Sequence, residues 1–324
     1  MAVYTQLSAE VLAELIAHYD VGELISAKGI AEGVSNSNWL VETTGGATGG
    51  TRFILTMYER RIDLDDLPFF LDLLDHLAAQ GCPVPRTIHD RAGASHRWLG
   101  EKAVALIEFL PGVSVDHPTP AQARSVGRVL AEMHAAAQSF AGARTNDLDP
   151  AESARVLAEC GATALAEIDP ALPAVIESAA TVAHDWPHDL PRAVIHSDLF
   201  PDNVLMLGDK VSALIDFYFA CTDAMAYDLA VTHAAWSFSS DGRDFNRAVG
   251  DALLEGYQQV RALTEAERAA LPLLAQGAAM RFISSRSYDW IHTPADALVT
   301  RKDPMAFVRR LDFYRAHGSE VFGL

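Results

Sequence analysis

A short polar motif followed by a hairpin pattern restricts the fold of this chain more than any other feature. The motif is His-x-Asp-x-x-x-x-Asn, with His196, Asp198 and Asn203 at its fixed positions. Two apolar stretches then flank Gly208-Asp209, and this pattern predicts a β-hairpin. Antiparallel pairing brings the start of the first strand beside the end of the second. We therefore expect Asn203 and Asp216 to lie together.

The chemistry of these side chains indicates phosphoryl transfer. An amide oxygen beside a carboxylate offers hard oxygen ligands, which suit Mg²⁺ held against phosphate oxygens. Asp198 on the preceding loop could accept a proton from a substrate hydroxyl or orient that hydroxyl. We expect His196 to orient this loop through hydrogen bonds rather than to exchange protons. The alternative is a polar loop before a structural hairpin, with Asp198 and Asp216 acting as caps.

Composition excludes several classes of protein. The 324 residues are 50% hydrophobic, which is enough apolar material for a large core. A formal net charge of −18 repels nucleic acid and anionic membranes, so neither is an expected partner. The three cysteines lie far apart in the sequence, which argues against a structural zinc site. Residues 1–10 lack a signal-peptide pattern, and no apolar run approaches the roughly 18 residues of a membrane helix. We expect a cytoplasmic protein, either a monomer or a homodimer.

The chain is expected to form an α+β fold in two parts. Residues 1–107 are predicted to form a smaller part with an antiparallel meander, 108–112 a connecting hinge, and 113–324 a larger, mainly helical part. In the first part the expected strands are 22–31, 38–43, 52–58 and 103–109, and the expected helices are 9–19 and 65–79. In the last part the expected helices begin at Thr119, which opens a capping box, and continue with 151–168, 171–186, 245–261 and 264–290. Pro272 should kink or restart the last of these helices.

Several motifs together resemble those of the aminoglycoside phosphotransferase and choline kinase superfamily. Besides His196–Asn203 and Ile215-Asp216-Phe217, they are Val34-Ser35-Asn36 with Asn38, Ile107–Gly112, Gly127–His134 and Tyr227–Ala230. The resemblance covers nearly the whole chain and implies a small-molecule kinase with a two-lobed, protein-kinase-like fold. It implies ATP and Mg²⁺ as cofactors, with the metal on Asn203 and Asp216 and catalysis by Asp198 with His196. It also implies nucleotide contacts from Ser35, Asn36 and Asn38, and from Glu108 and Leu110 at the hinge.

A narrower resemblance is to the second type of homoserine kinase within this superfamily. The segments that carry it, besides the catalytic motif, are Lys28–Val34, Ile54–Arg61, Asp66–Phe70, Leu214–Asp223 and Arg301–Pro304. It implies ATP-dependent phosphorylation of the hydroxyl of L-homoserine to O-phospho-L-homoserine, a step toward threonine. The alternatives are a kinase for choline, ethanolamine, hydroxylysine, methylthioribose or an aminoglycoside, and a non-catalytic nucleotide-binding pseudokinase.

One position departs from the superfamily pattern. The usual lysine of the third strand falls on Thr56, and its glutamate partner falls near Phe70, so both charges are absent together. Losing both members of an ion pair leaves no unpaired buried charge. Lys28, Arg52, Arg60 and Arg61 are the cations that could replace the lysine.

Other polar residues have both a functional and a structural interpretation. Homoserine needs an acidic group for its amine and a cation or backbone donors for its carboxylate. The candidates are Asp202, Tyr218, Asp223, Arg281, Arg286, Tyr288, Asp289 and Trp290, and each could instead be structural. Gly45–Gly50 is expected to be a solvent loop rather than a phosphate loop, because it contains no lysine. His134 is expected to be a hydrogen-bonded core residue.

Overall fold

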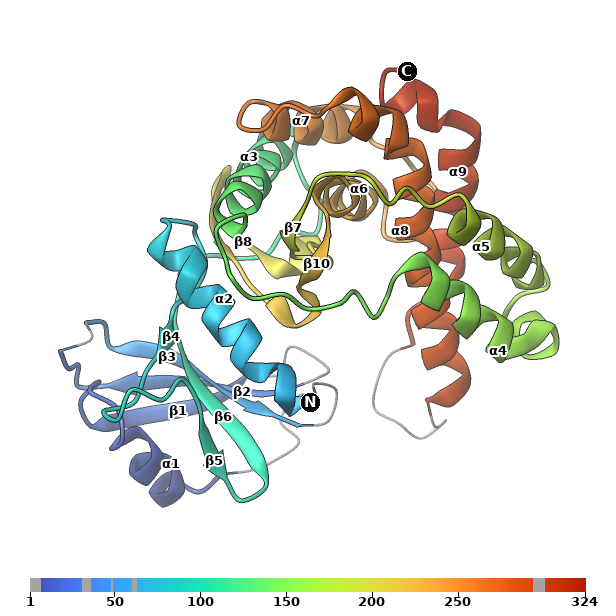
Figure 1. Ribbon diagram of the computed structural model, residues 1–324. Coiled ribbons are helices and arrows are strands. Elements are labelled where there is room, and N and C mark those ends of the chain that lie inside the picture. Colours follow the sequence, from blue (N-terminus) through green and yellow to red (C-terminus); the bar gives the residue numbers. More distant parts are fainter. Residues whose placement is uncertain (1–6, 31–35, 48, 60–62, 294–300) are drawn as a thin grey trace. The chain divides into compact units, whose positions relative to one another are not determined.

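The computed structural model describes residues 7–30, 36–47, 49–59, 63–293 and 301–324. The chain divides into two compact units, Met1–Pro111 and Gly112–Leu324, each with its own secondary structure (Figure 1). None of the helices in the described ranges combines the length and the apolar character needed to cross a membrane.

An antiparallel sheet organises the smaller unit. Its strands run in the order β1-β2-β3-β6-β4, and β5 pairs with β6. Their bounds are β1 Leu24–Ile30, β2 Asn36–Thr43, β3 Arg52–Tyr58, β4 Thr87–Ile88, β5 Arg97–Leu99 and β6 Lys102–Glu108. β2 pairs antiparallel with both β1 and β3, which confirms the predicted meander. Gly45, Gly46, Gly49 and Gly50 lie between β2 and β3 and outside any helix, as expected.

Two helices accompany this sheet, α1 (Ala9–Ile16) and α2 (Leu67–Ala79). Ser8 caps α1 as predicted, because its hydroxyl accepts a hydrogen bond from the Val11 amide at 3.3 Å. The helix ends at Ile16 rather than near residue 19. Tyr19 is already fully buried and forms a bridge with Asp90. The core of this unit combines apolar side chains of α1, β2, β3 and β6, among them Leu12, Ile16, Trp39, Phe53, Leu55 and Leu106.

The larger unit is mainly helical. Its helices are α3 Pro120–Ala137, α4 Pro150–Ile168, α5 Val175–His184, α6 Met225–Trp236, α7 Arg247–Gln258, α8 Glu265–His292 and α9 Met305–Val321. Two short antiparallel pairs complete it: β7 (Arg192–Ile195) with β10 (Cys221–Ala224), and β8 (Val204–Leu207) with β9 (Lys210–Leu214). α6 lies among α3, α7 and α8 (Figure 1), and every one of its residues is buried.

Local signals place several helix ends where the sequence predicts them. Thr119 and Thr264 each accept a hydrogen bond from the backbone of the third helical residue, whose side chain bonds back to the cap. Both capping boxes are therefore confirmed. Pro272 does not restart α8, which continues through it to His292. The region predicted as one helix over 171–186 is a short 3₁₀ turn, Leu172–Ala174, followed by α5.

Five elements were not predicted. β4, β5 and β10 contain two, three and four residues, too few to show an alternating pattern. α6 is buried on all sides and so has no polar face to reveal its period. α9 did carry a signal, because Phe307, Leu311, Tyr314, Gly318 and Val321 are spaced along one buried face.

Candidate active site

The β8–β9 hairpin brings the two ends of the polar motif together. Val204 pairs with Leu214, and the Ile215 amide donates to the Asn203 carbonyl at 3.0 Å. Asn203 therefore precedes the first strand and Asp216 follows the second at the same open end of the hairpin. The turn at Gly208-Asp209 is where the sequence predicts it.

The loop before this hairpin fixes Asp198. The side-chain amide nitrogen of Asn203 donates to the Asp198 carbonyl at 2.7 Å and reaches its carboxylate at 3.3 Å. On another side, the Arg281 guanidinium lies 3.5 Å from the Asp198 carboxylate. Because these contacts restrict its rotation, the Asp198 carboxylate is held in place before any ligand arrives.

His196 connects the loop to the end of β9. Its Nε2 donates to the Ile215 carbonyl at 3.0 Å, while its Nδ1 lies 3.3 Å from the Asp198 amide. One ring nitrogen is therefore a donor and the other an acceptor, which is the neutral imidazole. Complete burial lowers the pKa of His196, against the opposing charges of Asp228 and Asp198. This geometry fits the predicted orienting role.

Asp228, on the first turn of α6, anchors the same loop from inside the protein. Its carboxylate accepts the backbone amides of His196 and Ser197, both at 2.7 Å, and contacts His134 Nε2 at 2.9 Å. Burial acts to raise the pKa of Asp228, but the hydrogen bond from His134 and the neighbouring histidines outweigh it and lower the pKa. His134 in turn bonds the Tyr257 hydroxyl at 2.8 Å, so its predicted place as a bonded core residue is confirmed.

Two residues at the site have left-handed backbone geometry. Ser197 has a φ of 69° and Asp216 a φ of 65°, and no other non-glycine residue in the described ranges has a positive φ. This region costs L-residues about 1–3 kcal/mol and persists only where surrounding contacts impose it. At Ser197 those contacts include the Asp228 carboxylate.

The charges near Asp216 favour a cation. Desolvation, followed by the carboxylates of Asp198 and Asp202, raises the pKa of Asp216 to about 7, although Lys302 opposes the shift. The Asp216 side chain is exposed, and a bound cation there would relieve the repulsion from the neighbouring carboxylates. In the described ranges no three His, Cys, Asp or Glu side chains converge as a metal site. Mg²⁺ needs few protein ligands when phosphate oxygens supply the others, so Asn203 and Asp216 fit it.

The residues predicted to contact nucleotide lie in the smaller unit. Asn36 is buried, and its side-chain oxygen has no hydrogen-bond partner among the described residues. The Asn38 side chain accepts a hydrogen bond from Thr56 at 2.8 Å. Glu108 forms an ion pair with Arg86 at 3.0 Å, and Leu110 is half-buried. Ser35 lies outside the described residues.

The cations that could replace the strand lysine differ in their positions and partners. Arg52 is paired with Glu42 at 3.1 Å on an exposed part of the sheet. Lys28 lies on β1 opposite Leu40. Arg60 and Arg61 lie outside the described residues.

The substrate candidates separate by what their side chains already contact. Asp223 is 4% exposed, and its carboxylate bonds Asn146 at 2.7 Å and Arg192 at 3.3 Å, so it serves the β7–β10 pair. Arg281 is 3% exposed, and its guanidinium contacts Ser197 and Asp198. Asp202 is exposed, and Tyr218 is half-buried in the turn after β9.

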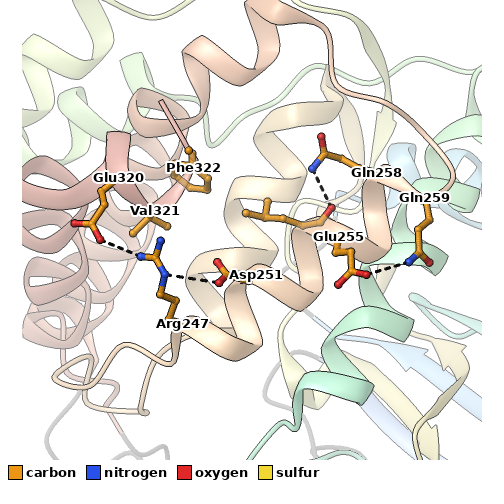
Figure 2. A pocket seen from close by; sticks show the side chains of 10 residues that line it. Arg247, Asp251, Glu255, Gln258, Gln259, Glu320, Val321 and Phe322 are labelled. Atoms are coloured by element: carbon orange, nitrogen blue, oxygen red, sulfur yellow. Dashed lines mark hydrogen bonds and ion pairs between the residues drawn. The ribbon is translucent and has the colours of Figure 1, made fainter.

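A surface pocket lies away from these residues, against α7 and the end of α9 (Figure 2). Arg247 crosses it, with Glu320 at 3.2 Å and Asp251 at 3.7 Å. None of the predicted site residues lines this pocket.

Comparison with known proteins identifies relatives over the whole chain. The model of the Phosphotransferase enzyme family matches residues 26–263. The homoserine kinase of Granulibacter bethesdensis is 48% identical over 326 aligned residues and is covered completely, as is this chain. The homoserine kinase of Methylobacterium radiotolerans is 49% identical, with 97% of this chain and 96% of the relative covered.

Solved structures resemble the chain at much lower identity. An amicoumacin kinase in complex with AMP-PNP and Ca²⁺ aligns with a TM-score of 0.68 at 14% identity, covering 96% of this chain and 94% of its own. A spectinomycin phosphotransferase in complex with ADP aligns with a TM-score of 0.66 at 13% identity, covering 98% of both chains. These likenesses concern the fold, and they confirm the predicted α+β kinase-like class.

Proposed function

The chain belongs to the phosphotransferase enzyme family, and from this premise we propose that it transfers the γ-phosphoryl group of ATP to the hydroxyl of L-homoserine. The product is O-phospho-L-homoserine. The observation that carries this proposal is the identity of 48% to a homoserine kinase, over the full length of both chains.

In the proposed reaction Asp198 accepts a hydrogen bond from the acceptor hydroxyl and orients its oxygen for in-line attack on the γ-phosphorus. The transition state of such transfers is loose, so positioning contributes more than strong base catalysis. The contacts of Asn203 and Arg281 with Asp198 support this role, because they limit the carboxylate to one orientation. His196 and Asp228 hold the backbone that carries it.

The remaining roles follow from charge and position. Asn203 and Asp216 would hold Mg²⁺, which when bound neutralises charge on the phosphate oxygens. Nucleotide contacts are assigned to Ser35, Asn36 and Asn38 and to the backbone around Glu108 and Leu110. Asp202 and Tyr218 are the candidates for the substrate's ammonium group.

The direct test is ADP release from Mg-ATP in the presence of L-homoserine, beside L-serine, choline and hydroxylysine. We expect strong stimulation by L-homoserine alone. Bound nucleotide without stimulation by any of the four would contradict the proposal and favour another acceptor or a non-catalytic role.

Asp198→Asn tests the assigned chemistry, because it keeps the shape of the side chain and removes its charge. We expect kcat to fall by about 10²–10⁴, the range for a lost acid–base group, with nucleotide affinity unchanged. The control is Asp209→Asn, which removes a carboxylate from the exposed turn of the same hairpin. Equal activity in the two variants would remove Asp198 from the mechanism.

A further inference from the structure

The chemistry of the acceptor requires a cation that the site described above does not supply. This inference rests on the proposed function. L-homoserine carries a carboxylate and an ammonium besides its hydroxyl, and a bound carboxylate is stabilised by an arginine with free donors. The required side chain must therefore be near Asp198 yet not already bonded to protein carboxylates.

Arg281 is near Asp198, but its guanidinium is already bonded to protein groups. Its Nη1 donates to the Ser197 carbonyl and, at 3.0 Å, to the Ser197 hydroxyl, while Nη2 lies 3.5 Å from Asp198. With only 3% of the residue exposed, its guanidinium faces the loop rather than a ligand. These contacts favour a positioning role for Arg281, which the sequence offers as a candidate for either a substrate contact or a structural role.

Arg286, five residues further along α8, is not bonded to a carboxylate of the described residues. Its Nη1 donates to the Asp303 backbone carbonyl at 2.9 Å, and its guanidinium carbon lies 4.6 Å from the centre of the Phe307 ring. It has no other hydrogen bond and no ion pair within the described parts of the chain. A half-buried guanidinium with most of its donors free can accept an anion.

An aromatic cluster connects Arg286 to the catalytic loop. The rings of Phe282 and Phe307 lie 4.7 Å apart, and Phe200 lies 4.8 Å from Phe282. Phe200 belongs to the loop itself, between Asp198 and Asp202. Arg286 packs on the Phe307 side of this cluster. The guanidinium is thus one aromatic layer away from the loop that carries Asp198.

The electrostatic situation of Arg286 is consistent with an anion site. Burial lowers its pKa to about 10, and the charges of Asp303, Asp198 and Asp202 only partly oppose that shift. Arg310, which stacks on the same Phe307 ring, has a pKa lowered to about 10 as well. Its guanidinium, however, is bonded to the backbone carbonyls of Ala234, Ala306 and Ser239, so it is not available.

We propose that the Arg286 guanidinium binds the carboxylate of the acceptor and so selects amino-acid alcohols over simple amino alcohols. The aromatic cluster and the Asp303 carbonyl hold the guanidinium plane. The acceptor's carboxylate supplies the counter-charge that the protein does not.

The test compares two acceptors that differ only in this group. L-homoserine carries the carboxylate, and 3-aminopropan-1-ol is the same molecule with hydrogen in its place. In Arg286→Gln we expect kcat/KM for L-homoserine to fall about 10–100-fold, the range for a hydrogen bond to a charged group. We expect kcat/KM for 3-aminopropan-1-ol to stay within about twofold of the wild type. Calorimetric binding of L-homoserine in the presence of ADP should weaken by a similar factor.

The matched control is Arg309→Gln. Arg309 also lies beside the 303 segment, with Asp303 at 3.8 Å, but its guanidinium donates to the Asp241 carbonyl at 2.7 Å. It should leave both acceptors unaffected. Arg286→Lys serves if Arg286→Gln does not fold. It keeps the charge but loses the fork, so it should show a smaller loss that is still selective for L-homoserine.

The outcomes distinguish a failure of the Arg286 assignment from a failure of the proposed function. A wild-type enzyme that phosphorylates L-homoserine, with Arg286 variants that lose both acceptors equally, would overturn the role of Arg286 and leave the proposed function in place. A wild-type enzyme that phosphorylates other alcohols but not L-homoserine would overturn the proposed function, and with it this assignment.

Discussion

At the scale of single residues, Asp228 is the group on which the candidate site depends most. One carboxylate joins the backbone of His196 and Ser197 to the buried His134, and through it to Tyr257. Asp228 touches neither the acceptor nor the phosphates in the proposed reaction. Its effect on the chemistry passes through the loop that presents Asp198, so we regard it as a positioning residue.

Asp228→Asn should therefore lower both stability and turnover. The Asp228 carboxylate is fully buried, and its negative charge is stabilised by two backbone amides and by His134. The neutral asparagine amide carries no such charge and cannot accept all of these hydrogen bonds. We expect the free energy of unfolding to fall by about 3 kcal/mol. We also expect kcat to fall at least tenfold at a temperature where the variant is folded, with the KM for ATP little changed. Urea denaturation and steady-state kinetics measure the two effects.

Asp223→Asn is the matched control for this variant. Asp223 is also a buried carboxylate of the larger unit, but its side-chain hydrogen bonds and ion pair within the described residues go to Asn146, Arg192 and the Ala224 amide rather than to the loop. It should lose stability and keep its kcat. If the two variants lose kcat to the same extent, the loop anchor is not what Asp228 contributes.

At the scale of elements, α6 holds the catalytic loop at two points. Asp228 lies on its first turn, and Trp236 at its end donates its indole N–H to the Leu199 carbonyl at 2.9 Å. A separation of eight residues is about 2.2 helical turns, so the two anchors lie about 80° apart around the helix axis. A third residue of α6, His233, points toward α9, where its Nδ1 meets the Tyr314 hydroxyl at 2.7 Å.

The buried His233 leads to a prediction of how the free energy of unfolding depends on pH. Burial lowers its pKa to about 3, whereas an unfolded histidine titrates near 6.5. Below pH 6.5 the unfolded chain binds a proton that the folded chain does not. The stability contributed by neutral His233 is thus complete above pH 6.5 and is lost as the pH falls toward 3. The loss should be about 1.4 kcal/mol per pH unit.

Urea denaturation at pH 7.5 and 5.5 measures this contribution by comparison of variants. His233→Gln should lose less stability than the wild type between the two pH values, whatever its stability at pH 7.5. His184→Gln, which removes an exposed histidine at the end of α5, should follow the wild type. A wild-type pH dependence in His233→Gln would show that another group is responsible.

At the scale of the whole molecule, the net charge of −18 is the dominant feature. Several ion pairs of the described residues have both partners exposed, among them Arg124–Glu255, Arg128–Glu132 and Arg155–Glu159. Each such pair contributes little, so these pairs offset only part of the repulsion among the acidic groups. Screening by salt should then stabilise the folded state, because the folded chain holds its charges closer together than the unfolded chain does.

Raising NaCl from 20 to 200 mM at pH 7.5 should increase the free energy of unfolding by on the order of 1 kcal/mol, or about 1–2 °C in Tm for a chain of this length. Differential scanning calorimetry measures the shift. An added neutral solute at the same osmolality controls for effects unrelated to charge. A Tm that stays constant or falls with salt would mean that attractive ion pairs outweigh the net repulsion.

Features that depend on neighbouring residues could be predicted from the order of the amino acids alone. The capping boxes at Thr119 and Thr264, the meander of β1–β3 and the β8–β9 hairpin each follow from short spacings. Turn chemistry and helix capping act over a few residues, so their signals are complete within a short stretch of sequence. The motif spacings also identified the family correctly: the family model matches residues 26–263, and a relative is similar over the full length of this chain.

Contacts between side chains that are far apart in the sequence depend on how the whole chain packs. The contact of Arg281 with Ser197 joins residues 84 positions apart, and that of His134 with Asp228 joins residues 94 apart. No local pattern distinguishes Arg281 from Arg286, since both are arginines on one long helix. Their roles differ because packing places one guanidinium on the catalytic loop and the other on Phe307. α6 escaped prediction for a related reason: burial on every side removes the polar face by which a helix is recognised.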